Sequence, residues 1–307
     1  MNKKLTILCG TALWLAATGS GHADTVYSSG VNDITTAVSG IIDLEGGVLN
    51  IDVGGSVTGS ATDPNGEAID VTDGTLNIYG DVAGASSGTF APGIQMSGGT
   101  VNIYSGSVAG GTSVNSIYTF GIQAQGGTLN IFGGNISGGA GTYGEGIDTE
   151  TAQVNMSGGT VQGGTGIYGE GIDADTTQVN ISSGIIQAGT GTFEFGIELT
   201  ESELNLQGGT VTGGSNGPFN EDLDAESGSD NVPSTANIYG QNYSAPLGPL
   251  AGNFGNVTGT LADGTALNLN YRQFPDSEIV LLPVPEPSSI ALAGLGVAAL
   301  FLGRRQK

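Results

Sequence analysis

Acidic side chains recur at a constant spacing in the middle of the chain. Two sets lie 25 residues apart, namely Glu145, Asp148 and Glu150, then Glu170, Asp173 and Asp175. Calcium takes six to eight oxygen ligands in loose geometry, so two neighbouring rows of carboxylates could share an ion. Paired carboxylates can also hydrolyse glycosides when one is protonated and the other ionised. A third interpretation is a solvated acidic face screened by salt.

The charge distribution excludes nucleic acid as a partner. The chain has 29 Asp and Glu against 6 Lys and Arg, for a net charge of −23. The basic residues lie at the two ends, except for Arg272. Binding DNA or RNA requires Lys and Arg that replace phosphate counterions, and an anionic lipid surface would repel this body.

The elements that must position the acids follow an internal repeat. Short apolar–Asn–apolar strings place their Asn residues 25 to 28 residues apart, at Asn50, Asn77, Asn102, Asn130, Asn155, Asn180 and Asn205. An Ile lies eight residues before each of these Asn, and a Val or Ile lies about six after it. A looser eighth unit holds Leu223 and Asn237, with an insertion around residues 228–233.

Each unit therefore carries three short stretches of alternating apolar and polar residues, separated by Gly-rich turns. A strand this short buries its apolar side only by stacking on its own copies, which forms one continuous core. The sequence predicts an all-β fold, a single-stranded parallel β-helix of about eight 25-residue coils. The Asn column should form an outward ladder of stacked amides. A second column should stack as an aromatic ladder: Phe90, Tyr118, Tyr143, Tyr168, Phe193 and Phe219.

The N-terminus has the pattern of a secretory signal peptide. Lys3 and Lys4 precede an apolar stretch from Leu5 to Ala17, which is too short for a spanning helix. Small residues place the cleavage site between Ala23 and Asp24. We expect a helical signal over residues 1–23, whose removal takes away the only Cys and the only His.

The C-terminus ends in a short hydrophobic helix with a basic stop. Its characteristic residues are Val284, Pro285, Glu286 and Pro287, then an apolar run over 290–302, then Arg304 and Arg305. This arrangement resembles the PEP-CTERM sorting signal of Gram-negative bacteria. The resemblance implies transient membrane insertion of the helix and tail removal by an exosortase, a membrane protease. It further implies export across the inner membrane to the cell surface or matrix, in association with exopolysaccharide or biofilm.

We therefore expect four segments: a signal peptide (1–23), β-helix repeats (24–245), a C-terminal β cap (246–283) and the sorting signal (284–307). The body resembles pectate-lyase-like and autotransporter-passenger repeats. The function favoured is a structural or adhesive surface protein without enzymatic activity or a required cofactor, with extracellular polysaccharide as a candidate partner. The alternatives are a glycan-active β-helix enzyme, a hydrolase or lyase, and a calcium-ordered binding module.

Overall fold

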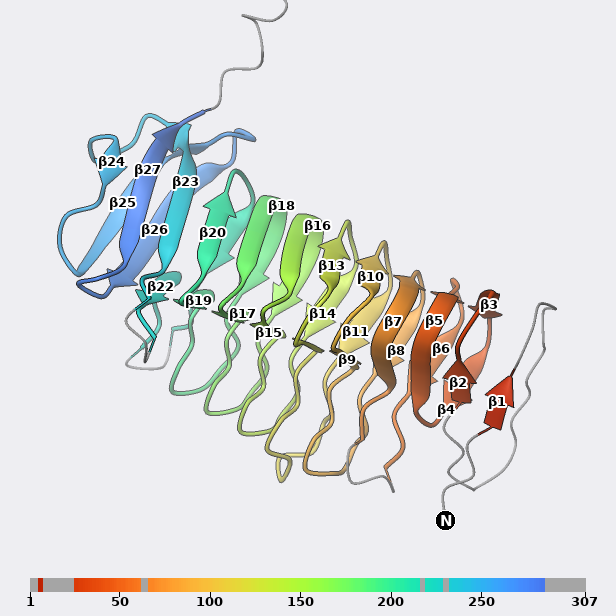
Figure 1. Cartoon of the computed structure of the whole chain (residues 1–307). Coiled ribbons are helices and arrows are strands. Elements are labelled where there is room, and N and C mark those ends of the chain that lie inside the picture. The colour runs from red at the N-terminus through yellow and green to blue at the C-terminus, as the bar shows by residue number, and fades with distance from the viewer. Residues whose placement is uncertain (1–4, 8–24, 62–65, 216–218, 229–231, 285–307) are drawn as a thin grey trace, which may run out of the picture.

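The computed structural model describes residues 5–7, 25–61, 66–215, 219–228 and 232–284. These residues form strands, turns and loops without a helix. The strands build a parallel β-solenoid of about 7 turns, with a small cap at its C-terminal end (Figure 1). The predicted fold class is confirmed.

Three strand positions repeat in every coil. The first is occupied by β2 (Thr25–Tyr27), β9 (Ile94–Met96), β12 (Ile122–Ala124), β15 (Ile147–Glu150), β17 (Ile172–Asp175), β19 (Ile197–Thr200) and β22 (Leu223–Glu226). The second holds β3 (Val31–Ile34), β10 (Thr100–Ile103), β13 (Thr128–Ile131), β20 (Glu203–Leu206) and β23 (Thr235–Gln241). The third holds β4 (Ala37–Ser39), β6 (Ser56–Thr58), β8 (Asp81–Ala83), β11 (Ser107–Ala109), β14 (Asn135–Ser137) and β21 (Thr210–Thr212). Four longer strands each run through two positions: β5 (Ile42–Ile51), β7 (Ile69–Ile78), β16 (Gln153–Gln162) and β18 (Gln178–Gln187).

The sequence repeat sets the strand register. Ile147 pairs with Ile172, which pairs with Ile197 in the next coil. All three are completely buried. Because alternate residues face inward, the Ile, Leu and Val columns of successive coils pack into one continuous hydrophobic core.

Both predicted ladders are present. Each ladder Asn from Asn77 to Asn237 donates its Nδ2 to the Oδ1 of the preceding Asn at 2.8–3.1 Å. Aromatic rings from Tyr118 to Phe219 stack with centroids 4.6–5.1 Å apart. Phe90 meets Tyr118 edge-on at 6.0 Å. Both spacings approximate the distance between neighbouring strands, about 4.8 Å.

The C-terminal end is closed by β24 (Gly248–Pro249), β25 (Phe254–Leu261), β26 (Ala266–Gln273) and β27 (Glu278–Pro283). β25 and β26 form an antiparallel hairpin, and β26 and β27 continue the solenoid by pairing in parallel with β22 and β23. The hairpin buries Leu267 and Leu269. It therefore shields apolar side chains at the last coil and pairs its strand edge.

Three successive coils hold a non-glycine residue in the left-handed region at the end of the first strand position. Thr151, Thr176 and Glu201 have φ values of 58°, 52° and 53°. A β-branched residue is strained there, because its Cβ approaches the backbone. The tight corner between the first and second strands therefore has an energetic cost.

The predicted terminal helices are not confirmed. Leu5–Ile7, inside the predicted signal, form strand β1, which pairs in parallel with β2. The alternating apolar residues Leu5 and Ile7 suit an edge strand there. The rest of the signal, with Ala23 and Asp24, lies outside the described residues, as does the sorting segment after Val284. In the part of the chain that the structure describes, no helix is long and apolar enough to cross a membrane.

Candidate functional site

The acid row consists of Asp148, Asp173, Glu198 and Asp224, one from each of β15, β17, β19 and β22. Register places each member directly beside the next. Each follows a completely buried Ile or Leu, so alternation turns its side chain away from the hydrophobic core. Sequence and register thus place four carboxylates in a line along the rod.

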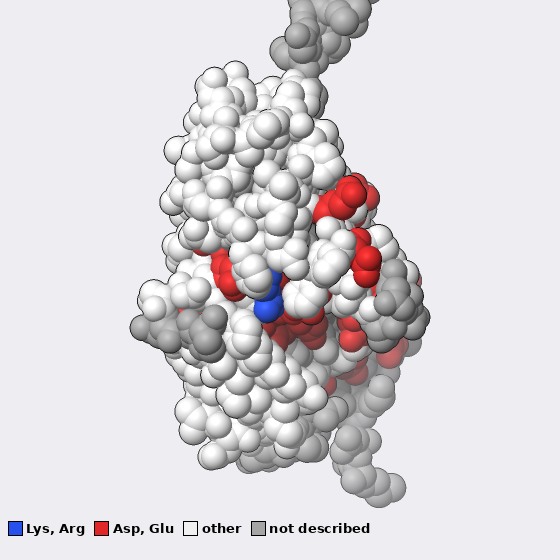
Figure 2. Space-filling model, turned by 90° about the vertical axis from the view of Figure 1, so that its left-hand side faces the viewer, with Lys and Arg blue, Asp and Glu red and all other residues white. Residues whose placement is uncertain are grey.

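Loops preceding these strands bring further acids against the row. Glu145 and Glu170 lie two residues before β15 and β17, and they are only 2% and 1% exposed. The carboxylate oxygens of Glu145, Asp148 and Asp173 lie within 4.8 Å of one another. The same holds for Glu170, Asp173 and Glu198, so Asp173 belongs to both groups. Figure 2, a view from the capped end, shows acids deep in a hollow beside a single blue side chain.

The structure therefore brings together four of the six residues predicted from the sequence. Glu150 and Asp175 are in register with each other but are exposed and belong to none of the acid groups in the described part of the chain. A third group of Glu198, Asp224 and Glu226 was not among the predicted site residues. Glu198 and Asp224 occupy the repeat position of Asp173, and Glu226 occupies that of Asp175. The repeat in the sequence could therefore have identified this third group.

The two ends of the acid row have different hydrogen-bond partners. At the N-terminal end, Gln123 donates its Nε2 to Asp148 Oδ2 at 2.9 Å. At the C-terminal end, Arg272 donates its Nε to Asp224 Oδ1 at 2.8 Å and a terminal nitrogen to Glu226 Oε1 at 2.9 Å. The same guanidinium makes an ion pair with the other oxygen of Asp224.

Arg272 is also held by aromatic rings. Its guanidinium carbon lies 5.0–5.3 Å from the ring centroids of Phe195, Phe219 and Phe274. The hydrogen bonds and ring contacts fix the guanidinium at the last group of acids. Burial alone would lower the pKa of Arg272, but Asp224 and its acidic neighbours raise it.

Burial and mutual repulsion shift the acids toward the protonated form. Burial raises the pKa of Asp148 to about 6 and that of Glu198 to about 7. The pKa values of Glu145, Glu170 and Asp173 are raised well above their ordinary range, first by burial and then by neighbouring carboxylates. The row thus lacks sufficient positive charge for its acids to ionise together.

All side chains of the two groups that share Asp173 offer carboxylate oxygens, which are candidate ligands for a hard cation. A glycoside hydrolase needs one carboxyl group kept protonated and a nearby partner kept ionised. Here every member of the two groups that share Asp173 has its pKa raised. The direction of these pKa shifts favours the protonated form of each carboxyl group and does not by itself identify a nucleophile among them.

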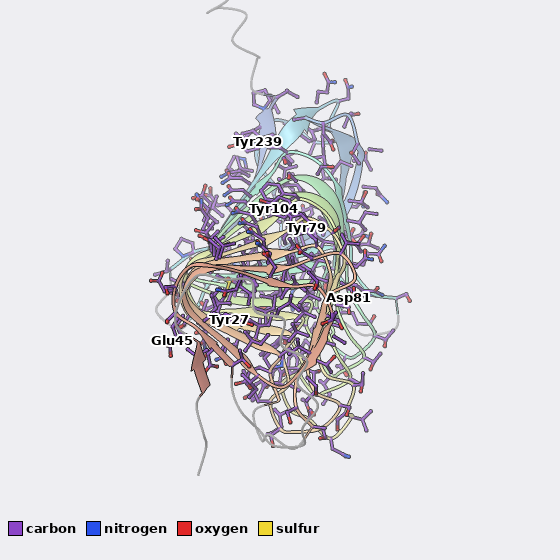
Figure 3. All side chains as sticks on the ribbon, turned by 90° about the vertical axis from the view of Figure 1, so that its right-hand side faces the viewer. Tyr27, Glu45, Tyr79, Asp81, Tyr104 and Tyr239 are labelled. Carbon is purple, nitrogen blue, oxygen red and sulfur yellow. The ribbon has the colours of Figure 1, made fainter. Side chains whose placement is uncertain are left out.

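A second face of the rod carries an aromatic stack that sequence reasoning missed. Tyr79, Tyr104 and Phe132 each lie two residues after a ladder Asn, and that spacing was the available signal. Their rings stack at 4.8 and 5.0 Å, and they are 36–50% exposed. Figure 3, seen from the N-terminal end, labels Tyr79 and Tyr104 on this face, with Tyr239 further along.

A hollow of about 270 Å³ begins where this stack ends. Tyr104 covers one face of Phe132, and the hollow extends past Phe132 along the following coils. Its polar lining includes the ladder amides of Asn155, Asn180 and Asn205, together with Ser157 and Ser182. The amides of Asn155 and Asn180 each use one N–H on the neighbouring Asn, which leaves a second N–H available, whereas Asn205 also donates to Glu203 Oε1 at 3.1 Å.

The fold and the C-terminus together define the class, a β-solenoid protein with a sorting tail. Residues 283–306 match the PEP-CTERM protein-sorting motif. No curated protein and no solved structure matches the chain. The chain is therefore an exported protein of the type that exosortase, a membrane protease, processes from a membrane-anchored precursor in Gram-negative bacteria.

Proposed function

We propose that the processed chain is a non-catalytic rod of the cell surface or extracellular matrix that binds extracellular polysaccharide. The observation that carries this proposal is the hollow beside Phe132. Carbohydrate-sized sites combine apolar or aromatic walls with a few fixed polar groups. Phe132 supplies the aromatic wall, and the ladder amides supply fixed polar groups along the floor.

The spacing along this face suits a polymer. The ladder hydrogen bonds hold the amides of Asn155, Asn180 and Asn205 in place, one per coil. Coils repeat every 4.8 Å or so, close to the length of one sugar unit in an extended chain. Ser157 and Ser182 provide small hydroxyl-bearing side chains beside the amides, which leaves room for a ligand. A polysaccharide lying along the rod would meet similar groups at each step.

A pull-down with the insoluble polysaccharide of the producing strain tests this function. Phe132→Ala removes the ring that borders the hollow, and we expect at least a tenfold loss of binding. Tyr79→Ala is the matched control, because it removes the ring at the far end of the same stack. Equal binding by the native protein and Phe132→Ala would contradict the proposal. Release of soluble sugar during incubation would favour the enzyme instead.

Localisation is tested separately. Deleting residues 284–307 in a host that carries exosortase should abolish the membrane-held precursor and the processed surface protein. The folded rod should persist, because the deletion removes no described strand. Unchanged processing and location would refute the surface assignment.

A further inference from the structure

The acid row has a positively charged side chain, Arg272, at its C-terminal end. In the described part of the chain, no Lys or Arg lies beside the middle of the row. Arg272, the only Lys or Arg among the described residues, forms ion pairs with Asp224 and Glu226 in the group that these two acids make with Glu198. The two preceding groups use the same strand positions and have no equivalent base. Arg272 therefore shows that one group of this row holds a positive charge between its carboxylates.

Two buried oxygens beside the uncompensated groups have no hydrogen-bond partner. Glu170 is 1% exposed, and its Oε2 accepts nothing, although the residue belongs to the group with Asp173 and Glu198. Gln123 is 8% exposed, and its Oε1 is also without a partner, while its Nε2 is used on Asp148. A buried polar atom without a partner costs free energy, so both oxygens are open to an electropositive partner, and the Glu170 oxygen belongs to one of the acid groups.

We propose that the two uncompensated groups bind a pair of calcium ions that share Asp173 as a bridging ligand. Glu145 and Asp148 supply the other side-chain ligands of one position, and Glu170 and Glu198 supply those of the second. Bidentate carboxylates or water would bring each ion to its six to eight oxygens. The site goes beyond the proposed polysaccharide binding, because it lies among different residues from the hollow beside Phe132.

The ligand chemistry selects calcium. All donors are oxygens, which suit hard cations rather than zinc or copper. Oxygens bound to one calcium ion lie up to roughly 5 Å apart, twice the Ca–O distance, whereas magnesium demands a tighter octahedron. Grouped oxygens within 4.8 Å of one another meet the calcium limit. Calcium also tolerates irregular coordination, which suits carboxylates that come from both loops and strands.

The test is a calcium titration of the purified full-length protein after treatment with chelator. Isothermal titration calorimetry should give two ions per chain. Saturation of one site at a hundred times its Kd raises Tm by roughly 5–10 °C. Sodium chloride of equal ionic strength should give no comparable rise, and magnesium should give a smaller one.

Two variants make the assignment specific. Asp173→Asn removes the shared ligand while keeping its shape, and it should abolish the calcium-dependent rise in Tm. Because it also removes a buried charge, its Tm in chelator should equal or exceed that of the native protein. Asp175→Asn is the matched control, since this exposed residue lies outside both groups and should keep the full response.

Three results would overturn the proposal. Equal Tm shifts with calcium and sodium would leave only a screened acidic face. A full calcium response in Asp173→Asn would place the ion elsewhere, and a stoichiometry of one would exclude the bridged pair. Polysaccharide binding lost on Phe132→Ala is a separate readout, so the two proposals fail independently.

Discussion

Replacing Arg272 by Met should expose how much the acid row depends on its internal cation. Met keeps much of the apolar stem that packs among Phe195, Phe219 and Phe274 but removes the charge. The side chain of Asp224 is completely buried and would lose both bonds to the guanidinium. The substitution therefore leaves a carboxylate buried without its partner.

The magnitude follows from that burial. Removing one partner of a buried ion pair costs about 3–5 kcal/mol, because the other charge remains desolvated. Loss of the guanidinium from the aromatic rings adds about 0.5–2 kcal/mol. The repulsion from Glu198 and Glu226 is no longer offset, so part of the cost will appear as proton uptake by Asp224. We expect a net loss of about 3–5 kcal/mol at pH 8.

Urea unfolding in excess chelator measures the change. Far-UV circular dichroism is the appropriate probe, because the only Trp lies in the predicted signal peptide. The control adds Asp224→Asn to the Arg272→Met background. Replacing both charges should recover most of the lost stability, since the neutral pair has no unpaired ion.

Two outcomes would refute this reasoning. A loss below about 1 kcal/mol would mean that Asp224 is not effectively desolvated. A double variant no more stable than Arg272→Met alone would assign the loss to ring packing and not to charge. Calcium should also stabilise Arg272→Met more than the native protein, because the third group of acids would then be open to an ion.

The remaining predictions concern the core, a strained corner and pH. Ile172→Ala should cost about 2–5 kcal/mol in urea unfolding, because the side chain is completely buried between its copies in the coils on either side; a cost below 1 kcal/mol would contradict the inward register. Thr176→Gly should be neutral or stabilising by up to about 1 kcal/mol, since relief of the left-handed strain offsets the added chain entropy; marked destabilisation in the same assay would argue against the strain. Burial raises the pKa of Asp148 to about 6 and of Glu198 to about 7, so the folded protein holds more protons than the unfolded chain between about pH 4 and 7. Stability without calcium should therefore fall as pH rises through that range, which urea midpoints in chelator at pH 5 and pH 8 would show; a rising midpoint would refute the raised pKa values.

The repeat made most of the rod predictable from sequence. A parallel solenoid pairs each residue with its copy one coil away, so columns read from the sequence become columns in space. Ile147 and Ile172, and Asn155 and Asn180, are partners for this reason. The same logic gave the acid row, because Asp148 and Asp173 occupy one column.

Contacts that do not follow the repeat were not predictable. Arg272 lies 48 residues from Asp224 and meets it only because the cap hairpin folds back beside β22. Glu145 lies in a loop, where alternation does not determine side-chain direction, so its turn toward the row required the structure. How deeply the row is buried likewise depends on the loops that precede its strands. Strand alternation in the sequence does not predict that depth.

The capped end of the rod, where β27 lies, is the end that continues into the sorting segment. β27 belongs to the cap and ends at Pro283, directly before the sorting segment. In a chain tethered through that segment, the cap is the attached end and the first coil is the free, outer end. At that outer end, within the described strands, β3 and β4 each pair on one side only, and cleavage after Ala23 would also remove β1 from β2. Export and signal cleavage would thus turn an unpaired strand edge toward the surroundings, where a strand of another molecule could extend the sheet.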